Sequence, residues 1–228
     1  MGQNFRKQRE AAVDALKAEG ILRSPSVIRA MLTVPREEFL PNDVKQYAYV
    51  DTPLPIGYGQ TTSALHMTAI FCEHGELKVG QKVLEVGAGC GYMSCVYAEV
   101  VAPSDLPKEK WGHVWTVEIV EELAEAARRN TEKAGYSDRV TAVHGDGSIG
   151  LRENSPYDVI IVTSSAPDVP EELVEQLKSD GILLIPVGGI HFYQELVRIR
   201  KHPDGTTSRE SLGGVAFVPM RGKFGWKS

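Results

Sequence analysis

Lys82-Val83-Leu84-Glu85-Val86-Gly87-Ala88-Gly89-Cys90-Gly91-Tyr92 is the stretch that decides the fold. An apolar run rich in β-branched residues leads into three glycines, and helical spacing follows over residues 93–101. Glycine lacks a Cβ, so this turn can take positive φ and let a ligand approach the backbone, beside the unpaired N–H groups of a helix start. The order strand, turn, helix predicts a site for an elongated, nucleotide-like ligand.

Two later strands each bring an acid to the same edge of the predicted sheet. Strand 113–118 ends at Glu118, whose carboxylate can accept hydrogen bonds from both hydroxyls of a ribose, and strand 139–144 runs into Gly145-Asp146-Gly147. The glycine spacing is G-x-G-x-G, whereas the dinucleotide fingerprint G-x-G-x-x-G places its third glycine one residue later. This spacing favours S-adenosylmethionine, which has no pyrophosphate. A purely steric role for the glycines stays open when the turn is taken alone.

Strands and helices alternate five times along the chain, which predicts the fold class. We expect an α/β fold of the Rossmann-like type, with a doubly wound, mostly parallel seven-stranded sheet, helices on both faces and the ligand at the carboxyl edge of the strands. The last two strands, 192–200 and 213–219, flank the turn 202–205 and predict an antiparallel C-terminal hairpin. The other strands are expected over 82–86, 113–118, 139–144, 157–163 and 181–189.

Helical spacing predicts the helices and a division of the chain. Helices are expected over 5–19, from Ser24 to the break at Val34, and over 64–77, 93–101, 119–134 and 168–178, the last with a start resembling a capping box at Asp168 and Glu171. The first two helices predict an extension packed on the main sheet. We expect residues 1–60 to form this extension with a substrate loop, and residues 61–228 to form the cofactor-binding core of one compact domain.

Segment 48–60 holds two prolines and two glycines beside apolar and aromatic side chains. We therefore expect a fixed loop that lines a site, not a central strand or helix. It ends in Thr61-Thr62-Ser63, before a predicted helix. Ser63, or the residue before it, can cap that helix, or the hydroxyls can bind a carboxylate; the two alternatives are compatible. His66 is either a packing side chain or a substrate contact, and Asp51 can simply brace the loop.

Composition argues against several classes of protein. The chain has 228 residues and a net charge of −5, enough for one substantial core but without the clustered Lys and Arg that sequence-independent nucleic-acid binding needs. Cys72, Cys90 and Cys95 have neither disulfide nor zinc-site spacing, so no metal is expected. Because no apolar run reaches membrane-span length and the N-terminus lacks a signal-peptide core, we expect a cytoplasmic protein without membrane partners. We further expect a monomer, and the acidic net charge predicts no nucleic-acid partner.

These motifs resemble the protein-L-isoaspartate (D-aspartate) O-methyltransferase family from Val34 to Pro219. The hydroxyl loop is the specific part, since many methyltransferases share the glycine turn. The resemblance lies in residues 34–39, 53–57, 59–63, 83–87, 145–147, 156–158, 166–167, 176–178 and 185–188. It implies methyl transfer from S-adenosyl-L-methionine, with S-adenosyl-L-homocysteine as product, to the α-carboxylate of L-isoaspartyl residues, and possible acceptance of D-aspartyl residues, in damaged proteins and peptides. The ester then closes to a succinimide, which starts repair.

The resemblance also implies roles for single residues. Ser63 is the active-site hydroxyl that orients the carboxylate, Glu118 holds the ribose, and Asp146 with Gly147 meets the adenine. The other expected acceptor-site residues are Gln60, Thr61, Thr62 and His66, and the other expected cofactor-site residues are Glu85, Gly87, Ala88, Gly89 and Gly91. The family more often has Ile at position 62, Pro at position 65 and hydroxyl residues at positions 88 and 90.

A carboxylate is already nucleophilic at neutral pH, so the expected reaction needs positioning and exclusion of water more than a strong base. Rival hypotheses are an S-adenosylmethionine-dependent enzyme for another carboxyl group, an RNA, an amine or a small molecule, a nicotinamide-dependent dehydrogenase, and a nucleotide-binding module without catalysis. Residues 163–167, TSSAP, lack the acid or Asn followed by Pro-Pro that amino-group methyltransferases often have. A peptide aspartate carboxyl methyltransferase of a biosynthetic pathway stays open.

Overall fold

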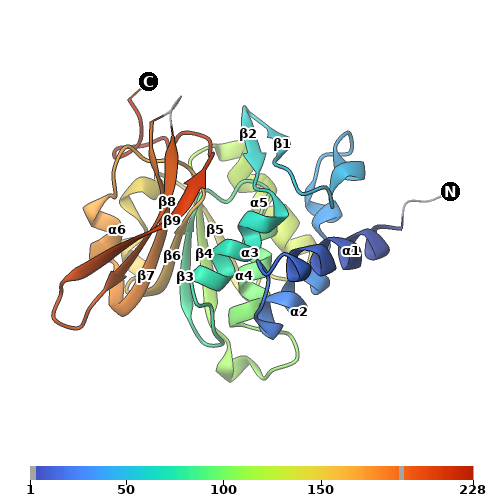
Figure 1. The fold of residues 1–228 in the computed structure, drawn as a ribbon, viewed down its shortest axis with the longest axis horizontal. Coiled ribbons are helices and arrows are strands. Elements are labelled where there is room, and N and C mark those ends of the chain that lie inside the picture. Colours follow the sequence, from blue (N-terminus) through green and yellow to red (C-terminus); the bar gives the residue numbers. More distant parts are fainter. Residues whose placement is uncertain (1–3, 190–192, 228) are drawn as a thin grey trace.

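A seven-stranded sheet forms the centre of the molecule (Figure 1). The computed structural model describes residues 4–189 and 193–227. The strands of this sheet are β3 Lys82–Val86, β4 His113–Glu118, β5 Val140–His144, β6 Tyr157–Val162, β7 Leu177–Gly188, β8 Gln194–Lys201 and β9 Thr207–Val215. They stand in the order β5-β4-β3-β6-β7-β8-β9; β3 to β7 are parallel, and β8 is antiparallel to both of its neighbours. The predicted doubly wound sheet with antiparallel C-terminal strands is confirmed.

Each face of the sheet carries its own apolar core, because alternate strand residues point to opposite faces. Val83 and Val159 join the core on one face, whereas Leu84 and Ile160 join the core on the other. The α-helices are α1 Phe5–Ala18, α2 Pro25–Thr33, α3 Leu65–His74, α4 Tyr92–Val101, α5 Glu121–Lys133 and α6 Glu171–Glu175. Since β3 has β4 on one side and β6 on the other, the turn after β3 lies at the topological switch point, where such sheets bind ligands.

The N-terminal helices pack on the main sheet, as the sequence predicts. Val13 and Leu16 of α1 and Met31 of α2 belong to the same core as Val83 of β3. Figure 1 shows α1 and α2 side by side near α4, and α2 contacts α4 directly. The boundary at residue 60 falls at the first residue of a strand and stays a prediction.

The expected loop before the hydroxyl residues contains a hairpin that the sequence analysis missed. Strands β1 Leu54–Gly57 and β2 Gln60–Thr62 pair antiparallel in a small sheet of their own. The turn between them is left-handed at Tyr58 and its two flanking glycines, which fits a tight two-strand connection. Leu54 and Ile56 form the buried face of β1, so the segment is fixed, as predicted, and it belongs to a sheet separate from the central one.

Two boundaries near the C-terminus differ from the sequence prediction. The sixth helix ends at Glu175 and does not reach Lys178, because Leu177 already pairs with Tyr157 of β6. No capping box forms: Pro170 holds the N-cap position, and Asp168 accepts a hydrogen bond from the next backbone N–H.

The C-terminal hairpin is confirmed, but its second strand was placed too late. Strand β9 begins at Thr207, directly after the turn, where the expected strand began at Gly213. Most of β9 is polar and exposed at the edge of the sheet, so it shows no apolar alternation to read. The predicted start of the first strand, Phe192, lies outside the described residues.

Candidate active site

Positive φ angles and close neighbours favour glycine at three positions of the turn after β3. Gly87 has a φ of +100°, and a Cβ on it would lie 2.3 Å from Oγ1 of Thr163, at the end of β6. Gly89 has a φ of +54°, and its Cβ would lie 3.0 Å from Cδ1 of Ile56 in the β1–β2 hairpin. Gly91 caps α4 and packs against α5. The first two glycines thus bring the hairpin and β6 close to the turn, and the third serves helix packing.

Glu118, at the end of β4, closes this turn. Its Oε2 accepts the backbone N–H of Gly89 at 2.9 Å, and its Oε1 accepts the N–H of Val120 at 3.0 Å. The side chain is buried yet lies on the wall of a pocket. A carboxylate oxygen has two acceptor positions, so both oxygens keep one position free for a ligand hydroxyl. Glu118 thus lines the pocket with acceptor positions free, and its role at a ribose stays a prediction.

Asp146, at the end of β5, holds the C-terminal segment in place. Its Oδ1 accepts the N–H and hydroxyl of Ser148 at 2.9 and 2.6 Å, and its Oδ2 accepts the N–H of Lys223 at 2.8 Å. A Cβ on Gly222 would lie 2.1 Å from Oδ1, so the C-terminal backbone lies directly against this carboxylate. Of the predicted adenine pair, Gly147 lines the pocket itself and Asp146 lies beside it.

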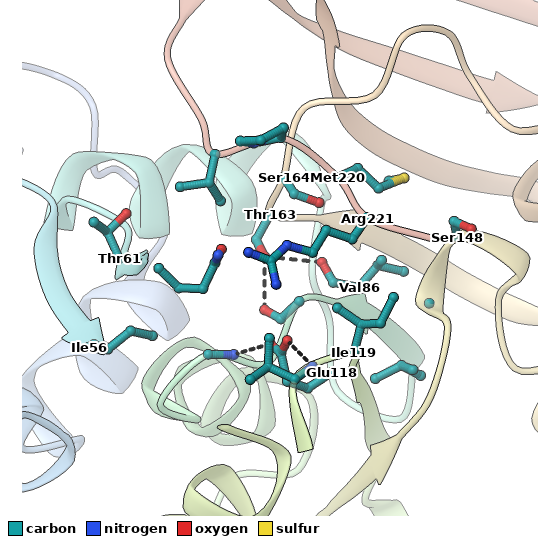
Figure 2. Close-up of a pocket in the computed structure, with 18 residues that line it drawn as sticks. Ile56, Thr61, Val86, Glu118, Ile119, Ser148, Thr163, Ser164, Met220 and Arg221 are labelled. Carbon is teal, nitrogen blue, oxygen red and sulfur yellow. Dashed lines mark hydrogen bonds between the residues drawn. The ribbon is translucent and has the colours of Figure 1, made fainter. Parts of the chain in front are cut away.

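The pocket above the glycine turn, here called the cofactor pocket, takes its walls from distant parts of the chain (Figure 2). Its lining residues are Ile56, Gln60, Thr61, Val86, Gly87, Gly89, Val117, Glu118, Ile119, Val120, Gly147, Ser148, Thr163, Ser164, Val218, Pro219, Met220 and Arg221. Figure 2 shows the side chain of Arg221 reaching into the pocket from the C-terminal segment. About 60 Å³ of free space is left around it.

The hydroxyl segment 61–63 lies across from the glycine turn. A small cavity joins the two and is lined by Thr61, Thr62, Ser63, Glu85, Gly87, Ala88, Gly89, Cys90, Tyr92, Met93 and Thr163. Neither predicted cap is observed: the N-cap of α3 is Ala64, and no side chain caps the helix. The capping interpretation of Ser63 is therefore wrong, and its hydroxyl stays available to a ligand. The predicted convergence of the hydroxyl residues and the glycine turn is confirmed in space.

A larger cavity of about 460 Å³, here called the acceptor cavity, also borders the hydroxyl segment. Its lining residues are Pro53, Thr61, Ser63, Ala64, His66, Met67, Thr163, Tyr193, Gly214, Val215, Ala216, Phe217 and Val218. Its lining is mostly apolar and includes three hydroxyl-bearing residues, Thr61, Ser63 and Thr163. The cavity is large enough for part of a peptide.

His66 reaches the acceptor cavity in a fixed orientation. Its Nδ1 lies 3.0 Å from both carboxylate oxygens of Asp51, and Oδ1 of Asp51 also accepts the backbone N–H of His66 at 2.9 Å. Asp51 therefore ties the segment before the hairpin to the first turn of α3, in agreement with its expected bracing role. With Nδ1 engaged, Nε2 is the ring nitrogen left for a substrate contact.

Glu85 is the buried acid beneath the small cavity. It has no exposed surface, and Oε2 accepts hydrogen bonds from the hydroxyls of Ser94 and Thr116, the latter at 2.7 Å. Burial raises its pKa from 4.5 to about 7, against the opposing effect of the two hydroxyl donors. Oε1 has no hydrogen-bond partner within the part of the chain that the structure describes. A buried acceptor of this kind fits a cationic or N–H-bearing group of a ligand.

Sequence reasoning missed the residues that complete both cavities from β6 and from the C-terminus. The hydroxyl of Thr163 lies 3.0 and 2.8 Å from the carbonyl oxygens of Val86 and Gly87, so it joins β6 to the glycine turn. Residues 218–221 reach the site because Ser165 pairs with the C-terminal segment, accepting the N–H of Met220 at 2.8 Å. The position of Thr163 at the end of a buried strand was the one available signal.

The described residues contain no group of three or more His, Cys, Asp or Glu side chains placed to hold a metal ion. Across residues 4–189 and 193–227, no helix has the length and apolarity needed to cross a membrane. The three cysteines are buried and unpaired.

The fold and the site together define a Rossmann-like, S-adenosylmethionine-dependent methyltransferase, with a glycine turn after the first sheet strand and an acid after the second. The model of the family "Protein-L-isoaspartate(D-aspartate) O-methyltransferase (PCMT)" matches residues 7–225. The chain belongs to this family.

Relatives agree with this assignment. The protein-L-isoaspartate O-methyltransferase of Hyperthermus butylicus is 54% identical over 223 residues, covering 98% of this chain and 92% of the relative. That of Staphylothermus marinus is 47% identical over 227 residues, covering all of both chains. A Plasmodium falciparum protein described as a protein-L-isoaspartate O-methyltransferase, crystallised with S-adenosyl-L-homocysteine, superposes with a TM-score of 0.80 at 26% identity, covering 96% of this chain and 99% of the other.

Proposed function

We infer that the reaction takes place where the two cavities meet, with the cofactor in the cofactor pocket and the acceptor peptide in the acceptor cavity. As a member of its family, the chain is an S-adenosylmethionine-dependent protein-L-isoaspartate O-methyltransferase that acts on proteins and peptides containing isoaspartate. One observation carries the arrangement: Thr61 and Thr163 line both cavities, so molecules bound in the two cavities meet at these side chains.

The cofactor pocket suits S-adenosylmethionine. Gly87 and Gly89 keep the turn free of side chains, Glu118 has free acceptor positions for the ribose, and Gly147 borders the expected adenine end. The unpartnered Oε1 of Glu85 lies beneath the small cavity and fits the ammonium group of the methionine part. When bound there, the cofactor supplies a methyl group on a sulfonium. Ala88 lines the small cavity and is the remaining proposed contact, whereas the predicted contact Gly91 lines neither cavity and packs against α5.

Ser63 is proposed to orient the acceptor carboxylate. It is half-buried, lines the acceptor cavity and does not cap α3. Its hydroxyl, together with that of Thr61, can donate to one carboxylate oxygen and leave the other free to react. His66 is proposed to contact the acceptor peptide from the cavity wall. The predicted acceptor contacts Gln60 and Thr62 lie outside this cavity: Gln60 lines the cofactor pocket, and Thr62 is buried beside the small cavity.

The chemistry that these residues perform is positioning. An anion meets a cation and both charges are partly neutralised in the transition state, so water that solvates them slows the reaction. Met67, Val215 and Phe217 line the acceptor cavity and exclude water there. A hydrogen bond to a charged acceptor contributes about 1.5–3 kcal/mol, which is the scale of the effect expected of Ser63.

Methyl transfer to matched peptides tests the function. Two peptides that differ only in aspartate or isoaspartate at one position are incubated with labelled S-adenosylmethionine. We expect label in the isoaspartyl peptide alone, in a base-labile form typical of an ester. Equal labelling of both peptides, or base-stable label, would exclude this acceptor and favour another methyltransferase.

The variant Ser63→Ala tests the role of the serine. We expect kcat/KM for the isoaspartyl peptide to fall about 10- to 100-fold, with S-adenosyl-L-homocysteine affinity changed less than about twofold. Ser179→Ala is the matched control, because Ser179 is exposed at the start of β7, away from both cavities. If Ser63→Ala weakened the cofactor equally, the serine would serve the cofactor instead. Repair through a succinimide, a cytoplasmic location, a monomeric state and independence from nucleic acid stay predictions.

A further inference from the structure

Arg36 is a buried cation directly behind the hydroxyl segment. It begins the 3₁₀ helix η1 Arg36–Phe39, and none of its surface is exposed. Its Nη2 donates to the backbone carbonyl oxygen of Ser63 at 2.8 Å. The other guanidinium groups, Nε and Nη1, have no hydrogen-bond partner among the described residues. A guanidinium carries five N–H donors, so most of its capacity is unused at the one place where it touches the site.

The charge of Arg36 has no ion-pair partner in the described chain. Glu37, the next residue, is engaged by Arg9, with Nη2 3.1 Å from Oε1, and by the Tyr49 hydroxyl. Asp51 is engaged by His66. The ring of Tyr92 is a favourable neighbour, with its centroid 5.5 Å from the guanidinium carbon, and the Asp51 carboxylate acts on the guanidinium from beyond ion-pair distance. Burial lowers the pKa of Arg36, but an arginine stays protonated at neutral pH.

A buried cation without a carboxylate partner is costly, which argues for a use of its charge. A carboxylate lies close by, because Glu37 is the next residue in the chain, but it bonds Arg9 and Tyr49 instead. The Tyr49 hydroxyl accepts the backbone N–H of Arg36 at 3.2 Å and the Nε–H of Arg9 at 2.7 Å. Arg9 also forms an ion pair with Glu37, whereas the guanidinium of Arg36 has no carboxylate partner in the part of the chain that the structure describes. The arginine without such a partner is the one bound to Ser63.

We propose that Arg36 is a positioning residue for the acceptor: it fixes the backbone of Ser63 and places a positive charge behind it that selects a carboxylate over a neutral group. The inference rests on the proposed role of Ser63. Inside a protein a fixed charge is weakly screened, so it acts on a bound anion without contact. The carboxylate supplies a negative charge for a guanidinium that has no ion-pair partner among the described residues, and a carboxamide of the same shape does not.

The test compares an isoaspartyl peptide with the same peptide carrying an α-carboxamide, measured as a competitive inhibitor. In Arg36→Met we expect KM for the carboxylate peptide to rise at least tenfold, while the inhibition constant of the carboxamide changes less than threefold. Arg36→Lys keeps the positive charge but loses the planar guanidinium. Compared with Arg36→Met, it should therefore recover most of the preference for the carboxylate peptide, with a kcat below that of the parent. Arg9→Met is the control, because it removes a cation from the same cluster that does not touch Ser63.

S-adenosyl-L-homocysteine affinity within twofold of the parent shows that each variant is folded. Equal weakening of both peptides in Arg36→Met would overturn the proposal and leave a packing role, and so would an unchanged preference. If Arg36→Met does not fold, Arg36→Lys decides: loss of carboxylate preference with the charge retained contradicts the proposal. A parent enzyme that fails to methylate the isoaspartyl peptide contradicts the proposed function first, before any variant is compared.

Discussion

Glu118 Oε2 and the backbone N–H of Gly89 form a hydrogen bond of 2.9 Å, which ties the end of β4 to the glycine turn after β3. The same carboxylate therefore shapes the turn and faces the cofactor pocket. Since β3 and β4 pair in register up to Val86 and Val117, Glu118 follows directly after the last paired residue, beside the glycine turn.

Replacing Glu118 by Ala should weaken S-adenosyl-L-homocysteine binding at least tenfold. The change removes both the acceptor for ribose hydroxyls and the bond that holds Gly89 in place. Calorimetric titration measures the effect, and Glu122→Ala, an exposed acid in the first turn of α5, is the control. An affinity within twofold of the parent would show that Glu118 does not face the cofactor.

Gly87→Ala separates close packing from backbone strain. Its φ of +100° disfavours any side chain, and its Cβ would also lie 2.3 Å from Oγ1 of Thr163. We expect a loss of about 2–4 kcal/mol in the free energy of unfolding, and weaker cofactor binding. Gly135→Ala is the matched control, because its φ is +80° and nothing lies within 4 Å of the added Cβ. Chemical denaturation measures both variants; equal losses would mean that contact with Thr163 is unimportant.

The site residues that the sequence predicted are those whose positions depend on nearby residues in the chain. The glycine turn and Glu118 follow from strand order and from which residue ends each strand, so the sequence predicts them and the structure places them at the cofactor pocket. The hydroxyl segment 61–63 also had a local signal in the sequence. Only the structure, with Ala64 at the N-cap of α3, excludes the interpretation that one of these hydroxyls caps the helix.

The residues that could not be predicted depend on long-range pairing. Thr163 reaches the glycine turn because β6 pairs with β3, 77 residues away from Val86 in sequence. Arg221 reaches the cofactor pocket because Asp146 and Ser165 hold the C-terminal segment, through contacts that no spacing rule encodes. The predicted end of α6 was wrong for the same reason, since the pairing of Leu177 with Tyr157 overrides helical spacing.

Glu85 should make stability depend on pH in an unusual direction. Its pKa is about 7 in the folded chain and about 4.5 when unfolded, so both states bind the proton below pH 4.5 and the folded state alone keeps it between pH 4.5 and 7. The contribution of Glu85 to the free energy of unfolding is therefore full below pH 4.5. It falls by up to about 3 kcal/mol as the pH rises to 7, and it stays constant above pH 7. Glu85→Gln keeps an oxygen for Ser94 and Thr116 but cannot titrate.

Thermal unfolding of the parent and of Glu85→Gln at pH 5, 6, 7 and 8 measures this effect. We expect the difference in Tm, variant minus parent, to increase between pH 5 and 7. Parallel curves would mean that the Glu85 carboxyl titrates near its ordinary pKa despite its burial.

Arg221 should yield its place when the cofactor binds. The side chain extends into the cofactor pocket and leaves about 60 Å³ free, whereas pockets for ligands of this size offer about 300 Å³ or more. It has no ion pair or side-chain hydrogen bond with residues 4–189 or 193–227, so moving it costs little. Arg221→Ala should therefore leave the Kd for S-adenosyl-L-homocysteine within about threefold or tighten it, as measured by calorimetric titration. Tenfold weaker binding would instead show that the guanidinium swings round to hold the cofactor.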